Sequence, residues 1–156
     1  MQRSTPQRRV VCQNRRATFE FDLEEPIEAG LVLLGSEVKS LRRGGASLAD
    51  AFVAFEGDRP VLYKCHIAPY AEANRQNHEP MRPRRLLLSL REIQRLRQAT
   101  RERGLTIVPV DLHFHGPWVK VEIAVGRGRK LHDKRAAIRE REDKREADRA
   151  IRRGES

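Results

Sequence analysis

The apolar residues that could build a core are confined to the middle of this chain. Most of its Val, Leu, Ile and Phe lie between residues 17 and 126, whereas the last thirty residues hold almost none. A segment of that length can bury roughly two-thirds of its unfolded surface around one core. The sequence therefore predicts one folded domain over 14–127, preceded by a flexible basic arm over 1–13 and followed by a basic tail over 128–156.

The net charge of +10 lies at the two ends of the chain. Residues 1–16 hold five Arg and no acid, and residues 127–156 hold twelve Lys or Arg against seven Asp or Glu, so the middle is neutral. A neutral body with cationic ends and a pI near 10.5 favours nucleic acid as the partner, with an anionic membrane surface as a weaker option. On composition alone, a solvated tail kept for solubility is an equal alternative.

The cysteines and the apolar runs indicate the compartment. Cys12 and Cys65 cannot form a disulfide framework, which favours a reducing cytoplasm over secretion. No apolar stretch follows the basic N-terminus, and no run approaches the ~18 apolar residues of a membrane span. We therefore expect a cytoplasmic protein with neither a signal peptide nor a membrane partner.

Alternating apolar and polar residues predict a small antiparallel β-barrel. Ser89 and Glu92 form the pattern of a capping box, which predicts one core helix over 89–103, and Pro109 predicts a bulge or an edge in its strand. The segment 71–83 is predicted as a loop. The predicted strands cover 17–23, 29–41 with a bend at Gly35, 51–55, 61–67, 106–114 and 118–125.

The tail is rich in helix-forming residues but has no apolar stripe. Between Arg129 and Arg153 there is neither Gly nor Pro. Ile138 and Ile151 would lie roughly 220° apart around a helix, so they cannot share a buried face. Packing on the body could not offset the entropy of ordering the tail. We expect the tail to be disordered alone and to become helical on an anionic surface.

One strand carries residues that suggest catalysis. Asp111, His113 and His115 alternate onto one face, but nothing else in the sequence supplies a nucleophile or a second shell for a metal. The favoured interpretation is the polar side of a barrel strand, so no metal and no cofactor are expected. An RNA-processing hydrolase and a structural ribosomal RNA-binding protein are the alternatives. Cys65 is interpreted as core filler, and Trp118 as barrel packing or a hairpin lid rather than a base-stacking residue.

Four segments in register resemble one family. They are Asn-Arg-Arg-Ala at 14–17, the run from Glu28 to Arg42, Arg-Leu-Leu-Leu at 85–88 and Gly-Arg-Lys-Leu-His-Asp-Lys-Arg at 128–135. In this order and spacing they resemble the small protein B family, the SsrA-binding (tmRNA-binding) proteins of bacteria. The resemblance extends from about residue 14 to residue 149.

The resemblance implies a fold, partners and the absence of catalysis. The family has an oligonucleotide-binding-type (OB-type) barrel, and its members are adaptors rather than enzymes. They bind the tRNA-like domain of tmRNA and, with elongation factor Tu and GTP on the same tmRNA, bring it to stalled ribosomes for tagging of the nascent chain. The tail enters the empty mRNA channel beside the small-subunit RNA of the decoding centre. A monomer is expected.

The resemblance also implies site residues, although Arg85 replaces the Lys that is common in the family. Glu28 and Glu37 would accept hydrogen bonds from base amino groups or orient a nearby Arg. From the residues alone, the plainer interpretation is that each is an exposed surface carboxylate. Leu87 faces away from Leu86 and Leu88 and would contact a base. The expected tmRNA face is Asn14, Arg15, Arg16, Glu28, Glu37, Lys39, Arg42, Arg84, Arg85, Leu87, Lys120 and Gly128. The expected ribosome-binding residues are Arg129, Lys130, His132, Asp133, Lys134, Arg135, Arg139, Arg141, Lys144 and Arg145, with His132 stacking on a base.

Overall fold

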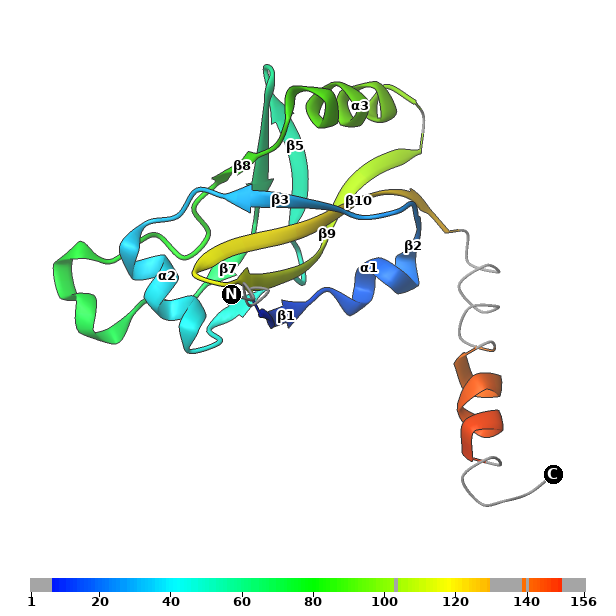
Figure 1. Cartoon of the computed structure of the whole chain (residues 1–156), viewed down its shortest axis with the longest axis horizontal. Coiled ribbons are helices and arrows are strands. Elements are labelled where there is room, and N and C mark those ends of the chain that lie inside the picture. The colour runs from blue at the N-terminus through cyan, green and yellow to red at the C-terminus, as the bar shows by residue number, and fades with distance from the viewer. Residues whose placement is uncertain (1–6, 103, 130–138, 140, 150–156) are drawn as a thin grey trace, which may run out of the picture.

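A computed structural model describes residues 7–102, 104–129, 139 and 141–149. It shows a β-rich body, with the described helical part of the tail extending from one end (Figure 1). None of the helices within the described ranges combines the length and the apolar content that crossing a membrane requires.

Six antiparallel strands close into a barrel: the antiparallel barrel was predicted from the sequence, whereas the strand over 84–87 was not. Each strand pairs with the next, and the pairing of the last with the first completes the ring. In ring order the strands are β9 (Leu105–His115), β5 (Phe52–Glu56), β6 (Arg59–Tyr63), β8 (Arg84–Leu87), β3 (Ile27–Leu31) and β10 (Trp118–Gly128). Two further strands pair outside the ring, β1 (Arg8–Gln13) with β9 and β2 (Phe21–Leu23) with β10.

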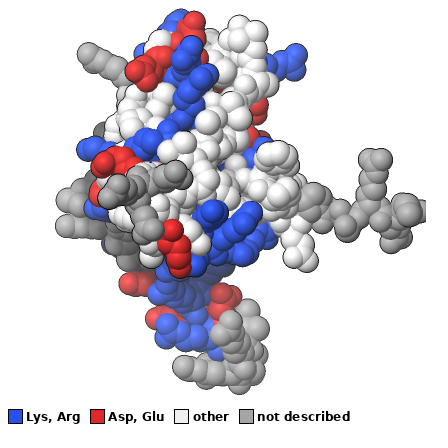
Figure 2. Space-filling model, turned by 90° about the vertical axis from the view of Figure 1, so that its left-hand side faces the viewer, with Lys and Arg blue, Asp and Glu red and all other residues white. Residues whose placement is uncertain are grey.

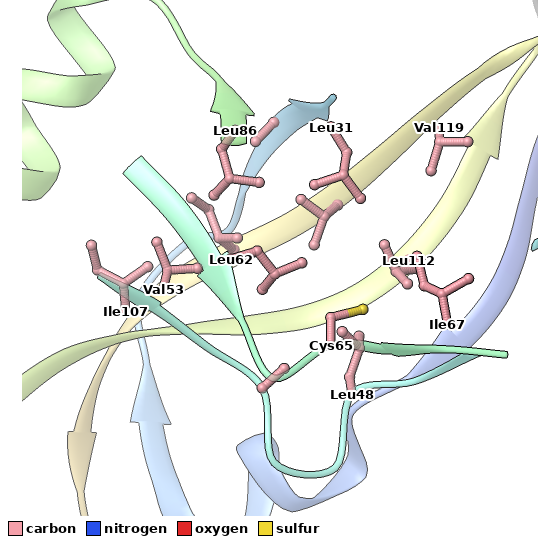
Figure 3. Packing of buried hydrophobic residues seen from close by; sticks show 14 of the residues in the cluster. Leu31, Leu48, Val53, Leu62, Cys65, Ile67, Leu86, Ile107, Leu112 and Val119 are labelled. Atoms are coloured by element: carbon pink, nitrogen blue, oxygen red, sulfur yellow. The ribbon is translucent and has the colours of Figure 1, made fainter. Parts of the chain in front are cut away.

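The barrel encloses one apolar core to which every strand of the ring contributes (Figure 3). Cys65 is completely buried in it, which confirms its interpretation as core filler. Burial raises the pKa of the Cys65 thiol to about 12. Among the core side chains are Leu31, Val53, Leu62, Cys65, Leu86, Ile107, Leu112 and Ile123.

A bulge in β9 lies where Pro109 predicted an irregularity. Asp111 pairs with Glu122 and Pro109 with Ile123, so Val110 has no partner on β10. The extra residue reverses the alternation, because a bulge shifts the following side chains to the opposite face. Consequently Ile107 and Leu112 share the core, whereas strict alternation would place Val108, and not Ile107, on the face of Leu112.

The predicted strand over 17–23 is wrong in its first half. Residues Arg15–Glu20 form helix α1, and only Phe21–Leu23 are extended, as β2. The side chain of Asn14 caps α1 by accepting a hydrogen bond from the Ala17 amide at 3.3 Å, and its own amide donates to the Pro109 carbonyl at 2.9 Å. This tertiary contact overrides the local alternation.

The predicted long strand over 29–41 is also wrong. It divides into β3, which ends at Leu31, and helix α2 (Gly35–Arg42), which begins at the glycine expected to bend a strand. The Glu37 carboxylate accepts a hydrogen bond from the Leu34 amide at 2.8 Å and so satisfies a free donor at the start of the helix. The buried side chains Glu37, Ser40 and Leu41 have helical spacing.

The remaining elements agree more closely with the sequence. Helix α3 (Leu90–Thr100) begins after Ser89 with the predicted capping box, and Gly104, at φ +80°, follows its end. On this helix Leu96 is buried, whereas Leu90 is exposed. The predicted loop 71–83 contains a short 3₁₀ helix, η1 (Ala71–Gln76), and β4 (Ala46–Ser47) pairs with β7 (His66–Ile67) in a separate small sheet.

The N-terminal end of the chain differs from expectation. The arm expected to be flexible through residue 13 forms β1 from Arg8 onward. In the tail, residues 139 and 141–149 are helical with every described side chain exposed, and disorder of the free tail stays a prediction. The missing apolar stripe agrees with this exposure. The other tail residues from 130 onward lie outside the described residues.

Candidate nucleic-acid interface

Part of the expected RNA face lies on the outside of β8, β3 and β10. Leu87 pairs with Gly30, and Gly30 pairs with Lys120, which pairs in turn with His113 of β9. Directly paired residues point to the same side of a sheet, so these four positions form a row across the barrel wall. Glu28 lies two residues from Gly30 on β3 and therefore on the same face.

Leu87 projects from this face as expected. It is 58% exposed, whereas Leu86 is buried. Glycine at position 30 allows Leu87 to lie close over β3, because a Cβ there would come within 3.1 Å of the Leu87 Cβ. An exposed leucine held against the backbone offers an apolar surface to an unstacked base or to a sugar.

Glu28 belongs to a network of charged side chains that crosses three strands. His113 is completely buried, with Nδ1 2.7 Å from Asp111 Oδ1 and Nε2 3.1 Å from Glu28 Oε2. Arg8 of β1 contacts Asp111 and donates to Glu122 Oε1 at 2.9 Å. Both ring nitrogens of His113 are occupied by these two contacts.

Sequence reasoning missed Arg8 and Glu122 as parts of this face. Arg8 was expected in a flexible arm, and the sequence pattern did not single out Glu122. The alternating Asp111, His113 and His115 were the available signal. Among the described residues, no three His, Cys, Asp or Glu side chains are arranged to hold a metal ion.

Glu37 and Arg84, both expected on the tmRNA face, are completely buried instead. They pair with each other, and Arg82 Nη2 donates to the second Glu37 oxygen at 2.6 Å. Arg84 also donates to the Cys65 carbonyl at 2.6 Å. In this conformation neither side chain can contact RNA, and the pair instead fixes α2 against β8.

The remaining expected face residues lie elsewhere on the surface. Asn14 is buried in its capping role, while Arg15 and Arg16 are exposed on α1. Lys39 lies over the Tyr70 ring, with Nζ 5.7 Å from its centroid. Arg42 is also exposed on α2, Arg85 on β8 and Gly128 at the end of β10.

Two Arg residues, Arg9 of β1 and Arg42 of α2, lie together on another part of the surface. Arg9 lies 5.4 Å from the centroid of the Phe114 ring and donates to the Arg42 carbonyl at 2.6 Å. Trp118 is 68% exposed beside the β9–β10 turn, so its interpretation as barrel packing is wrong. The exposed ring is available to stack on a base.

The described tail residues extend the basic surface of α1. Arg141 donates to the Thr18 hydroxyl at 3.1 Å, and an open depression is lined by Arg15, Arg141, Lys144, Arg145 and Asp148. Arg129 pairs with Asp22 at 3.1 Å and Arg139 is exposed. Figure 2 shows Lys and Arg gathered on the lower part of the body and along the described tail. The expected tail residues Lys130, His132, Asp133, Lys134 and Arg135 lie outside the described residues.

A closed OB-type barrel with basic extensions and an exposed apolar and polar face defines a nucleic-acid-binding protein of the oligonucleotide-binding class. The SmpB protein family model matches residues 11–153. The chain therefore belongs to the SmpB protein family.

Individual relatives agree with this assignment. The chain is 48% identical to the SsrA-binding protein of Chloroflexus aurantiacus, over 92% of this chain and 91% of the relative. It is equally identical to the SsrA-binding protein of Anaeromyxobacter dehalogenans strain 2CP-C, over 94% and 90%. A chain in a solved structure described as "tmRNA-SmpB: a journey to the center of the bacterial ribosome" is 37% identical, with a TM-score of 0.67 over 82% of this chain and 94% of that one.

Proposed function

We propose that this protein is a cytoplasmic, non-enzymatic adaptor of trans-translation, which binds the tRNA-like domain of tmRNA and delivers it to stalled ribosomes. The observation that carries this proposal is the outer face of β8, β3 and β10, where Leu87 and Glu28 are accessible on a rigid barrel wall. The names of the relatives and of the solved structure support tmRNA as the RNA.

The body would recognise a folded RNA through its shape and its unpaired bases, because proteins rarely read the deep groove of RNA helices. Leu87 would pack against an unstacked base, and Glu28 would accept from a base amino group. Arg15 and Arg16 on α1 are exposed and able to neutralise phosphates nearby. Elongation factor Tu with GTP would occupy the same tmRNA, beyond this surface.

The tail would act separately, in the empty mRNA channel beside the small-subunit RNA at the decoding centre. All described side chains over 141–149 are exposed, so a helix there can present Arg141, Lys144 and Arg145 to phosphates that surround it. An occupied channel would exclude the tail, which would restrict action to ribosomes without message at that position.

Deletion of residues 131–156 tests this division of labour. We expect the shortened protein to bind a tRNA-like-domain transcript with nearly unchanged affinity, since Leu87, Glu28 and α1 remain, but to support no tagging on stalled ribosomes. Gel-shift titration and a reconstituted tagging assay measure the two activities.

The reciprocal variant is Leu87→Asp in the full-length chain. It places a charge on the barrel face and is expected to abolish transcript binding, while the exposed position keeps the effect on folding small. Loss of transcript binding on tail deletion would contradict the separation of the two surfaces. Sequencing of the RNA that copurifies with the full-length protein identifies its natural partner.

A further inference from the structure

His113 is a buried polar residue that the proposed RNA contacts do not use. Its ring lies within the barrel wall, where β9 adjoins β1 and β10, and it reaches Glu28 of β3. Nδ1 is 2.7 Å from Asp111 Oδ1, and Nε2 is 3.1 Å from Glu28 Oε2. The ring therefore bridges the two carboxyl groups, with one nitrogen at hydrogen-bonding distance from each.

The contact with His113 engages only one of the two Glu28 oxygens. The Glu28 side chain is 38% exposed, and its Oε1 lies 3.7 Å from His115 Nδ1, beyond hydrogen-bonding distance. Within the described part of the chain, no other hydrogen bond to the Glu28 carboxylate is present. Oε1 is therefore a free acceptor on a side chain whose orientation is fixed through Oε2.

The network behind His113 is anchored at both sides of β9. Arg8 contacts Asp111 and Glu122, and Asp111 is itself buried. Lys120 pairs with His113 in the strand register, so its charge also faces this site. These groups hold Asp111 in place, and Asp111 in turn holds the imidazole ring toward β3.

We propose that His113 is a positioning residue for RNA recognition. It holds Glu28 so that Oε1 accepts a hydrogen bond from the exocyclic amino group of an unpaired base, while Leu87 contacts the same or the adjoining nucleotide. Leu87 packs against Gly30, and Gly30 lies two residues from Glu28 along β3. This spacing of about 7 Å is similar to the length of one nucleotide. Carboxylates recognise cytosine N4 in this way. The inference rests on the proposed function.

Two substitutions separate the two contacts of the ring. His113→Asn places an amide near the position of Nδ1, which keeps the donor to Asp111 and removes the one to Glu28. His113→Gln places an amide near the position of Nε2, which keeps the donor to Glu28. With full-length protein and a tRNA-like-domain transcript, we expect His113→Asn to weaken binding about tenfold, the scale of one hydrogen bond to a charged group. His113→Gln should retain affinity within about threefold.

A double-mutant cycle with Glu28→Gln distinguishes positioning from a general structural role. If His113 acts through Glu28, His113→Asn has no further effect on affinity once Glu28 is Gln. Wild-type affinity of His113→Asn, or full additivity of the two losses in variants with matched thermal unfolding, would overturn the inference. Leu87→Ala is the control for the face itself. If Leu87→Ala weakens binding while the losses from His113→Asn and Glu28→Gln are fully additive, the face binds the transcript but His113 does not position Glu28. A wild-type protein that does not bind the transcript rejects the proposed function as well.

Discussion

A buried charged pair between α2 and β8 determines how α2 lies on the barrel. Glu37 and Arg84 are both completely buried, and the Arg84 guanidinium also donates to the carbonyls of Cys65 at 2.6 Å and Pro80 at 3.2 Å. A buried pair of this kind contributes little net stability relative to apolar side chains, but removal of one partner leaves an uncompensated charge. Its role is to fix the position of α2, and not to contact RNA.

Replacement of Glu37 by Gln should therefore destabilise the fold strongly. The Arg84 charge would remain buried without a counterion, so we expect the free energy of unfolding to fall by about 3–5 kcal/mol. Urea denaturation at pH 7 measures this loss. Glu25→Gln, at an exposed position, is the matched control and should change stability by less than about 0.5 kcal/mol. If Glu37→Gln and Glu25→Gln were equally stable, the claim that Glu37 compensates a buried Arg84 charge would be wrong.

The Glu37 carboxylate should also make the stability of the fold depend on pH in the acid range. Burial raises the pKa of Glu37, but hydrogen bonds from Arg82, the Leu34 amide and Arg84 outweigh burial, so the pKa lies below its ordinary value. Its contribution is then complete above the unfolded pKa of about 4.3 and is lost as pH falls through the lower folded pKa. We expect thermal unfolding scans between pH 6 and 3 to show a steeper acid loss for wild type than for Glu37→Gln.

At the scale of elements, sequence patterns located what local interactions determine. The capping box of Ser89 and Glu92 lies within four residues and marked the start of α3 correctly, and strict alternation located β10. Helices α1 and α2 were missed because distant contacts stabilise them. Asn14 contacts Pro109, and Glu37 contacts Arg84, across separations of 95 and 47 residues.

The candidate site divides in the same way. The outward orientation of Leu87 followed from alternation with Leu86, and it is confirmed. The burial of Arg84 could not be predicted, because the short strand β8 gives no local sign that a carboxylate on α2 compensates its charge. The link from Arg8 to Asp111 joins residues 103 positions apart, and only the pairing of β1 with β9 brings them together.

Strand β1 should behave as part of the fold rather than as a flexible arm. Cys12 lies in it, and burial raises the pKa of its thiol to about 11. Since the thiolate is the reactive form, we expect Cys12 to react with a thiol reagent at pH 8 about 100-fold more slowly than an unstructured cysteine. A Cys65→Ala variant isolates Cys12, and the same protein in urea supplies the unstructured rate. Equal rates in buffer and in urea would show that β1 is detached.

For the whole molecule, the distribution of charge separates recognition from attraction. The sequence over 17–126 is neutral, and the five Arg of residues 1–16 and the basic tail supply the excess positive charge. Because the barrel is electrically neutral, it can present Leu87 and Glu28 without binding other polyanions non-specifically. The basic ends raise the rate of association with RNA. Salt should therefore weaken tmRNA binding mainly through the Arg residues of 1–16, and ribosome binding mainly through the tail.

The salt dependence of transcript binding measures which end contacts tmRNA. If ~6–10 phosphates are contacted, raising salt from ~50 to ~200 mM weakens binding roughly 10³- to 10⁵-fold. Replacing Arg15 and Arg16 by Gln should lower the slope of log affinity against log salt by about 1.5, near the value for two lost phosphate contacts. Deletion of 131–156, which removes more basic residues, should leave this slope nearly unchanged if the tail serves the ribosome, as we propose. The reverse pattern, with a slope that follows the tail and not α1, would assign tmRNA binding to the tail.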